Sequence, residues 1–399
     1  MILDRITPAP PDAILGLTEA FKSDDRPSKI NLGVGVYQDD SGVTPIMNSV
    51  KAAEAKILTT EKTKSYLSIG GAPEYKAHVQ DLLFGADHPV MKEGRARTAH
   101  TPGGTGGLRV GAEFLKQIQP DATVWGSSPT WANHPGIFTA AGFKMESYPY
   151  YNPATMGLDY DAMRDALKKV PAGDIVLLHV CCHNPTGVDL AEDQWKEVGQ
   201  IAAAQGWIPF LDFAYQGLGE DLEKDRAGLL QMLDAVPELF VASSFSKNFG
   251  LYRERTGALT VVASEKDAAG AAFSHVEKTI RVIYSNPPAH GGLIVSTILD
   301  DASLRAQWET EVVAIRDRIK SVRTAFVKEL SARGVDRDFS FIEQQKGMFS
   351  FSGLSDDQVA FLRAEKGIYI VKGGRINVAG ITTRNIEYLC DSIAEALKR

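Results

Sequence analysis

Short apolar runs alternate with segments of helical periodicity through the middle of the chain. The runs that are typical of buried strands cover residues 122–125, 175–182, 207–212, 239–242 and 258–262. The helical patterns between them cover residues 105–117, 191–205 and 226–235. Strands that alternate with helices form a mostly parallel sheet with helices on both faces. The pattern therefore predicts the α/β fold class.

The two ends of the chain have a different pattern. A proline-rich start predicts an irregular arm to about residue 12, and a short helix at 11–21 and a strand at 30–37 follow. The last third predicts helices at 301–332 and 383–397 and strands at 339–351, 368–371 and 375–379. These elements indicate a second, smaller α+β domain. We expect an arm at 1–11, a large domain at 45–312, and a small domain formed by 12–44 and 313–399.

Composition narrows the classes of partner. The chain has 399 residues and a formal net charge of −7, which argues against nucleic acid or an anionic membrane as the main partner. It lacks an apolar run of about 18 residues, so we expect no transmembrane helix. The first residues do not have the pattern of a signal peptide, and three cysteines form no disulfide framework. These features predict a cytoplasmic protein.

Polar residues follow three of the expected strands. Asn184 comes after the run at 175–182, Asp212 and Tyr215 follow the next run, and Lys247 follows the run at 239–242. Ligands of open parallel sheets bind beyond the carboxyl ends of the strands, so these side chains are expected to share one crevice. Taken singly, each has an ordinary alternative, such as a turn for Asn184 or a solvated loop for Lys247. The joint arrangement favours a site.

The lysine lies beside residues that suit a phosphate group. A lysine just past a buried strand is expected to be partly uncharged, and only an unprotonated amine attacks a carbonyl carbon. Ser244, Ser246 and Arg255 flank it, and the glycine-rich turn TPGGTGG at 101–107 leads into a helix whose N-terminus favours anions. The turn lacks the P-loop lysine, and Arg109 interrupts the dinucleotide pattern, which disfavours a nicotinamide enzyme. Together these features suggest pyridoxal 5′-phosphate (PLP).

Adjacent Cys181, Cys182 and His183 raise the question of a metal site. Zinc needs about four ligands, and the chain has no second Cys or His pair at a suitable spacing. We therefore expect no metal and interpret the cysteines as core residues.

The sequence resembles a fold-type I PLP enzyme, and specifically a class I aminotransferase of the aspartate/aromatic amino acid type. The resemblance runs from NLGVGVY at 31–37 to GRINVAG at 374–380. Its specific segments are TPGGTGGLRV at 101–110, CCHNPTG at 181–187, DFAYQG at 212–217, SSFSKNFGLYRERTG at 243–257 and YSNPPAHG at 284–291.

The resemblance implies a role for each candidate residue around the cofactor. Lys247 would hold PLP covalently and then move a proton, and Asp212 would pair with the pyridine nitrogen, supported by His134. Tyr215 and Asn184 would bind the phenolic oxygen, and Trp131 would stack on the ring. The phosphate would be bound by Gly104, Thr105, Ser244, Ser246, Arg255 and, from the neighbouring subunit of a homodimer, Tyr66.

It also implies how substrates would bind. Arg375 would hold the α-carboxylate, and Arg281 would reach across the dimer to the side-chain carboxylate of a dicarboxylic substrate. Gly35 lies in a segment that would close over the substrate. A surface position is the alternative for both arginines.

The expected reaction moves the amino group of L-aspartate to 2-oxoglutarate by a ping-pong mechanism and gives oxaloacetate and L-glutamate. A dual-specificity enzyme for tyrosine and phenylalanine is the closest alternative, because the two types share the residues above. Another PLP reaction, such as decarboxylation, racemisation or elimination, and an inactive PLP-binding module remain as further alternatives.

Overall fold

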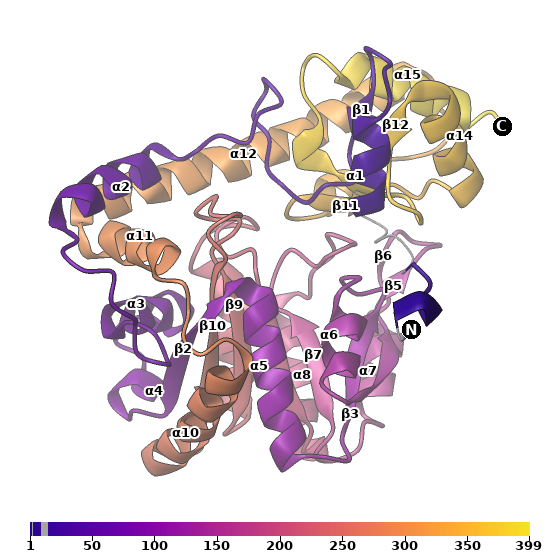
Figure 1. The fold of residues 1–399 in the computed structure, drawn as a ribbon. Helices are drawn as coiled ribbons and strands as arrows, with labels where there is room; N and C mark the ends of the chain where they lie inside the picture. Colours follow the sequence, from indigo (N-terminus) through magenta and orange to yellow (C-terminus); the bar gives the residue numbers. More distant parts are fainter. Residues whose placement is uncertain (2, 9–14) are drawn as a thin grey trace.

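A seven-stranded sheet forms the centre of the computed structural model, which describes residues 1, 3–8 and 15–399 (Figure 1). In spatial order the strands are β2 (Ala96–Pro102), β10 (Thr256–Val262), β9 (Leu239–Ser244), β8 (Ile208–Phe213), β7 (Ile175–His179), β3 (Thr123–Ser128) and β4 (Lys144–Pro149). Strand β10 is antiparallel to both of its neighbours, and the pairs from β9 to β4 are parallel. The expected α/β class with a mostly parallel sheet is confirmed.

The central strands are apolar on both faces, which explains their uninterrupted hydrophobic runs. In β8 and β9, Phe210 and Phe240 point to one core, while Leu211 and Val241 point to the other. The first core is covered by α5 (Gly103–Ile118), α6 (His134–Ala140) and α10 (Lys266–Ile283). The second core is covered by α7 (Tyr160–Leu167), α8 (Glu192–Gln205) and α9 (Ala227–Ala235), among others. Both faces of the sheet are therefore shielded from water.

A layer of helices connects this sheet to the rest of the chain. Helix α2 (Asn48–Thr60) packs against α11 (Ala289–Asp300) and the long α12 (Ala302–Ala332) (Figure 1). The remaining elements next to the sheet are α3 (Pro73–Phe84), α4 (Pro89–Lys92), β5 (Tyr151–Asn152), β6 (Gly157–Leu158) and η2 (Lys224–Arg226). No helix in the described part of the chain combines the length and the apolar character needed to cross a membrane.

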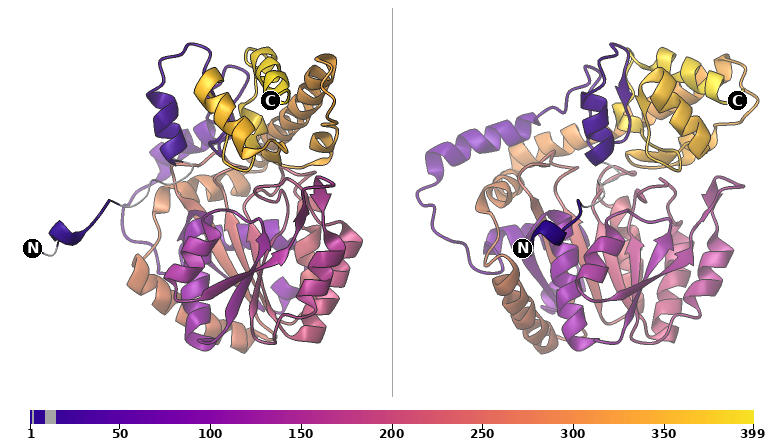
Figure 2. Two further views of the ribbon diagram at one scale, coloured as in Figure 1. Left: turned by 90° about the vertical axis from the view of Figure 1, so that its right-hand side faces the viewer. Right: turned by 45° about the vertical axis from the view of Figure 1, so that its right-hand side comes forward.

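A separate apolar core lies above the sheet, where residues 30 and 32 pack with the last third of the chain (Figures 1 and 2). Its elements are α1 (Leu15–Lys22), β1 (Ile30–Asn31), α13 (Phe341–Gln344), β11 (Phe349–Phe351), α14 (Asp356–Lys366), β12 (Ile368–Tyr369), β13 (Arg375–Asn377), η3 (Val378–Gly380) and α15 (Ile386–Ala396). Helix α12 contributes to both cores. Its first half faces the core of the sheet with Trp308, Val312, Ile315 and Ile319, and its second half faces the small core with Phe326 and Leu330.

Five expected strands are shorter than the sequence pattern indicated, namely those at 30–37, 175–182, 339–351, 368–371 and 375–379. Of residues 30–37, only Ile30–Asn31 form a strand, because side chains bind the backbone that follows. Asn377 donates to the carbonyl oxygens of Val34 and Val36, at 2.7 and 2.8 Å, in place of a neighbouring strand. Residues 339–351 contain the short helix α13 before the three-residue β11.

The N-terminal prediction was partly wrong as well. The arm contains one 3₁₀ turn, η1 (Leu3–Arg5), which stands away from the sheet in Figure 2. The expected helix at 11–21 is observed as Leu15–Lys22, and residues 11–14 lie outside the described part.

Candidate active site

The polar residues that follow the strands meet at one cavity of about 240 Å³ at the carboxyl ends of β7, β8 and β9. The expected residues that line it are Gly35, Gly104, Thr105, Trp131, Asn184, Asp212, Tyr215, Ser244, Ser246, Lys247, Arg255 and Arg375. They come from segments that are more than 300 residues apart in the chain. The fold therefore assembles the constellation that the motifs predicted.

Lys247 follows β9, is half-buried and lines the cavity. Burial, and to a smaller extent the nearby charge of Arg255, lower the pKa of its amine to about 8, while Asp212 opposes both effects. The amine nitrogen lies 5.7 Å from the ring centre of Tyr215 and 5.2 Å from that of Tyr252. No hydrogen bond to this nitrogen occurs among the described residues. The amine is therefore poised to lose its proton near neutral pH.

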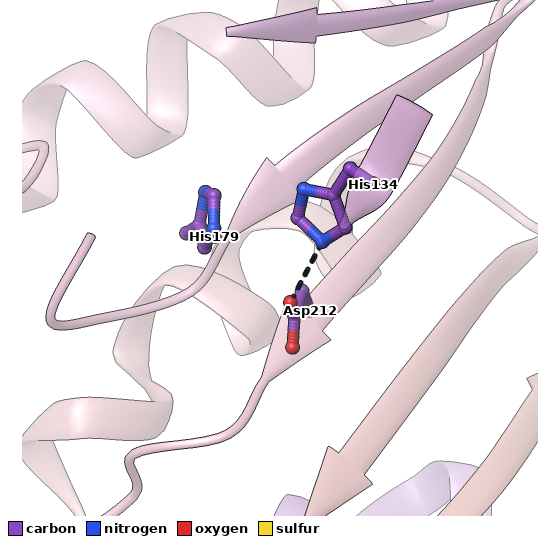
Figure 3. A group of neighbouring side chains, drawn as sticks. All are labelled: His134, His179 and Asp212. Carbon is purple, nitrogen blue, oxygen red and sulfur yellow. Dashed lines mark hydrogen bonds and ion pairs between the residues drawn. The ribbon is translucent and has the colours of Figure 1, made fainter. Parts of the chain in front are cut away.

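Asp212 ends β8 with its carboxylate held by a histidine. Nε2 of His134, at the start of α6, lies 2.9 Å from the carboxylate oxygen, and Thr130 lies 2.8 Å from the other ring nitrogen. Figure 3 shows the two side chains directed at each other. Burial, the largest single effect, would raise the pKa of Asp212, but the His134 hydrogen bond and the electrostatic interactions with His134, His179 and Lys247 together outweigh it, and the pKa is lowered. The carboxylate is therefore charged inside the protein, ready to pair with a cationic group.

His179 is a site residue that the motifs did not indicate. It ends β7 directly opposite Asp212 in the sheet register, and its ring lies 5.1 Å from that of His134. Its Nε2 is buried without a partner, and burial lowers its pKa to about 3, so the ring is neutral. The ligand atoms of His134, His179 and Asp212 lie within 4.8 Å of one another, close enough for a metal ion (Figure 3). The absence of a metal thus stays a prediction.

The first turn of α5 forms a cradle beside Ser244 and Arg255. Gly103 has φ of 74°, in the left-handed region that favours glycine, and a Cβ there would lie 2.5 Å from a guanidinium nitrogen of Arg255. A Cβ at Gly104 would lie 3.2 Å from Cβ of Ser244. Free backbone N–H groups, two serine hydroxyls and one guanidinium converge here, which is the donor set of an anion site.

On the opposite wall, Arg375 is buried against Phe349. Its guanidinium carbon lies 4.4 Å from the Phe349 ring centre, and one terminal nitrogen donates to the carbonyl of Gly33 at 2.5 Å. Its Nε has no partner, and burial lowers its pKa. Gly35 lies beside the same ring, where a Cβ would be 2.9 Å from Cζ of Phe349. The unpaired edge of the guanidinium can bind a carboxylate from this cavity.

Asn184 and Tyr215 form a polar pair between these two walls. The Asn184 amide nitrogen donates to the Tyr215 hydroxyl at 3.5 Å, and the amide oxygen is buried without a partner. Burial raises the pKa of Tyr215, so its hydroxyl keeps its proton. Both groups can therefore donate a hydrogen bond to an oxygen in the cavity.

Three expected residues do not line this cavity, and one of them, His134, lies behind Asp212, to which it is hydrogen-bonded. Tyr66 is 92% exposed, and Arg281, near the end of α10, is exposed and contacts the hydroxyl of Ser285. Both were expected to act in a neighbouring subunit, so their roles stay predictions.

Four lining residues were missed by the motif analysis: Leu108, His179, Ala214 and Phe349. For His179 the missed signal was a polar residue inside the apolar run expected at 175–182, because β7 ends at this histidine. Phe349 had no signal, because only the folded chain brings β11 to the sheet.

The comparisons with known proteins agree with this geometry. The family model "Aminotransferase class I and II" matches residues 27–393. An aspartate aminotransferase of Salmonella typhi is 50% identical over 396 residues, which cover 99% of this chain and 100% of that protein. The chain belongs to the class I and II aminotransferase family.

Two solved structures of aminotransferases have the same fold. An aromatic-amino-acid aminotransferase from Burkholderia pseudomallei, covalently bound to pyridoxal phosphate, has a TM-score of 0.97, with 47% identity and 100% of both chains covered. An aromatic amino acids aminotransferase from Psychrobacter sp. B6, cocrystallised with aspartic acid, has a TM-score of 0.97 and 44% identity, again with 100% of both chains covered. The expected family and its fold are confirmed.

Proposed function

We propose that this aminotransferase uses PLP to move the amino group of L-aspartate to 2-oxoglutarate, giving oxaloacetate and L-glutamate by a ping-pong mechanism. The observation that carries the proposal is the buried Lys247 amine, with a pKa of about 8, in the same cavity as the charged Asp212. A nucleophilic amine and an anion that can pair with a ring nitrogen are the two groups that PLP chemistry requires from a protein.

The residues of the cavity fit this cofactor. The phosphate is suited by the first turn of α5 together with Ser244, Ser246 and Arg255. The Asn184 amide oxygen, which has no hydrogen-bond partner, and the Tyr215 hydroxyl form a polar wall of the cavity. Asp212 would hold a protonated ring nitrogen, and Trp131 would cover a ring face. When bound, PLP withdraws electrons from the substrate Cα, which makes the proton on that carbon acidic.

Side chains of the protein then move the Cα proton and maintain the negative charge beside the cofactor ring. Lys247, once its nitrogen is free, removes the proton from the substrate Cα as a general base, and its lowered pKa suits that task near neutral pH. Asp212 stays ionised through its bond to His134. Tyr215 would donate a hydrogen bond to the oxygen on the cofactor ring.

Substrate recognition rests on two arginines and a second subunit. Arg375 would bind the α-carboxylate with the edge of its guanidinium that has no partner. Arg281 and Tyr66 lie outside the cavity of their own chain, and we propose that they complete the cavity of a partner in a homodimer. Gly35 and its neighbours would close over the bound substrate and exclude water.

We also propose the division into an arm (1–11), a large domain (45–312) and a small domain (12–44 with 313–399). The separate apolar core supports it, since that core combines Ile30 and Leu32 with residues from the last third of the chain. Three free, buried cysteines support a cytoplasmic location, where thiols stay reduced.

The preference between aspartate and aromatic substrates is tested by their ratio of kcat/KM. We expect aspartate to exceed phenylalanine and tyrosine with 2-oxoglutarate as acceptor, because a distal carboxylate gains an ion pair that an aromatic ring cannot form. An aromatic substrate that equals or exceeds aspartate would favour the dual-specificity alternative, which the names of the two structural neighbours support. Alanine or fumarate in place of oxaloacetate would indicate another PLP reaction.

A further inference from the structure

Tyr252 connects three parts of the site and has no role in the proposed function so far. It lies in the turn between Lys247 and Arg255, and its ring centre is 5.2 Å from the Lys247 amine nitrogen. Its backbone carbonyl accepts a hydrogen bond from the Arg255 guanidinium at 3.0 Å. One residue thus touches the amine and holds the arginine of the anion cradle.

The third contact of Tyr252 reaches the small domain. The backbone N–H of Tyr37 donates to the Tyr252 hydroxyl at 2.9 Å. This N–H belongs to residues 33–37, the covering segment, which contributes Gly35 to the cavity. Burial raises the pKa of Tyr252 to about 12, so the hydroxyl remains neutral at working pH and keeps a lone pair for this bond.

The covering segment is held from two sides. On the small-domain side, Arg375 donates to Gly33, and Asn377 donates to Val34 and Val36. On the opposite side, the Tyr252 hydroxyl binds the last amide of the segment, at Tyr37. Arg375 therefore fixes the segment to the carboxylate clamp, and Tyr252 fixes it to the turn that carries the amine.

We infer that Tyr252 is a positioning residue, whose hydroxyl holds the covering segment over the substrate and whose ring shields the Lys247 amine. The inference rests on the proposed function, since it assigns a task within that site. The two parts of this side chain have different effects. The hydroxyl acts on substrate retention through the segment, and the ring acts on the proton affinity of the amine.

The groups that face the Lys247 amine determine how the Tyr252 ring can affect the pKa of that amine. They are the charges of Arg255 and Asp212 and the rings of Tyr215 and Tyr252. Because burial is the largest cause of the lowered Lys247 pKa, a smaller side chain at 252 admits water and raises that pKa. Loss of the hydroxyl alone leaves the ring, and hence this shielding, in place.

Two substitutions in the holoenzyme separate these effects. In Tyr252→Phe, we expect faster hydrogen–deuterium exchange in the peptide that contains residues 33–37 and a KM for aspartate that rises about three- to tenfold, the effect of one neutral hydrogen bond. Its kcat and the pH midpoint of kcat, which reports the substrate complex in which the Lys247 amine is free, should stay as in the parent protein. In Tyr252→Leu, the midpoint should also move to higher pH, by at least about 0.5 unit, and kcat should fall.

Tyr388→Phe is the matched control. Its hydroxyl donates to the carbonyl of Lys366 at 2.8 Å within the small domain, away from the cavity, so its loss should change neither the exchange nor the KM. Unchanged exchange and KM in Tyr252→Phe would overturn the inference, as would an equal pH shift in the Phe and Leu variants. A parent protein that does not transaminate aspartate would instead refute the proposed function.

Discussion

His134 holds the Asp212 carboxylate through Nε2 at 2.9 Å, and this contact requires a proton on that ring nitrogen. The pKa of Asp212 is lowered, so its carboxylate is ionised and can only accept a hydrogen bond. Nε2 must therefore carry the proton. The other ring nitrogen, Nδ1, is hydrogen-bonded to the Thr130 hydroxyl, 2.8 Å away. The chain from Thr130 to Asp212 keeps a negative charge inside the protein.

Removing the carboxylate should cost more activity than removing its support. We expect Asp212→Asn to lower kcat by about 10³-fold or more, because the pyridine nitrogen loses its counter-charge. His134→Ala should lower kcat only about 10- to 100-fold, the effect of one hydrogen bond to a charged group. Steady-state kinetics with aspartate would measure both. Equal losses would contradict the assignment of His134 as a supporting residue.

The lowered pKa of Lys247 predicts how the rate of covalent PLP attachment depends on pH. An amine with a pKa of about 8 is unprotonated in about one molecule in ten at pH 7, against about one in three thousand at the ordinary 10.5. The rate at which PLP attaches covalently to the cofactor-free chain should therefore rise with pH and level off above about pH 8. Stopped-flow absorbance would measure this midpoint.

Arg255→Gln should move that midpoint upward. The charge of Arg255 lowers the pKa of Lys247, so its removal favours the protonated amine and a higher pH is needed to discharge it. PLP binding should weaken as well, because the cradle loses its guanidinium. A midpoint that stays near pH 8 or falls would contradict this electrostatic account.

Arg281→Leu tests the proposed second subunit. The kcat/KM for aspartate should fall at least about 100-fold, as expected for a charge-assisted pair with the distal carboxylate, while that for phenylalanine should change little. Arg363→Leu is a matched control, because Arg363 is equally exposed but lies on α14 of the small domain. If aspartate and phenylalanine suffer equal losses in Arg281→Leu, the assignment is wrong.

The sequence predicted the site better than it predicted the segments that cover the site. Lys247, Asp212 and Asn184 follow buried parallel strands, and the carboxyl ends of such strands lie along one edge of a sheet. Their convergence could therefore be inferred from the order of the apolar runs. Trp131 and Arg375 required the family resemblance, since Trp131 lies several residues beyond the run at 122–125 and Arg375 follows no expected strand of the large sheet.

The covering segment could not be predicted from local pattern. Residues 32–37 have the alternation of a strand, but their carbonyl groups bind Arg375 and Asn377 from a distant part of the chain. Phe349 reaches the cavity in the same way, through tertiary packing. The helical periodicity of α12 also does not show where the helix passes from one core to the other, because each half presents an apolar face to its own core.

Two helical glycines provide a test of how tightly α5 is seated. A Cβ at Gly107 would lie 2.7 Å from the carbonyl oxygen of Ala258 in β10, so Gly107→Ala should destabilise the protein by about 1–3 kcal/mol and weaken PLP binding. Gly270, in α10, has no atom within 4 Å of such a Cβ, and Gly270→Ala should stabilise by about 0.5–1 kcal/mol. Chemical denaturation would measure both, and stabilisation by Gly107→Ala would contradict the packing.

The most direct test is a pair of half-reactions on the protein loaded with PLP. With L-aspartate alone, the account predicts about one equivalent of oxaloacetate per active site, and later addition of 2-oxoglutarate should release the same amount of L-glutamate. The same steps with Lys247→Ala should give almost none of either product. Full product formation by Lys247→Ala, or no oxaloacetate from the parent protein, would contradict the account.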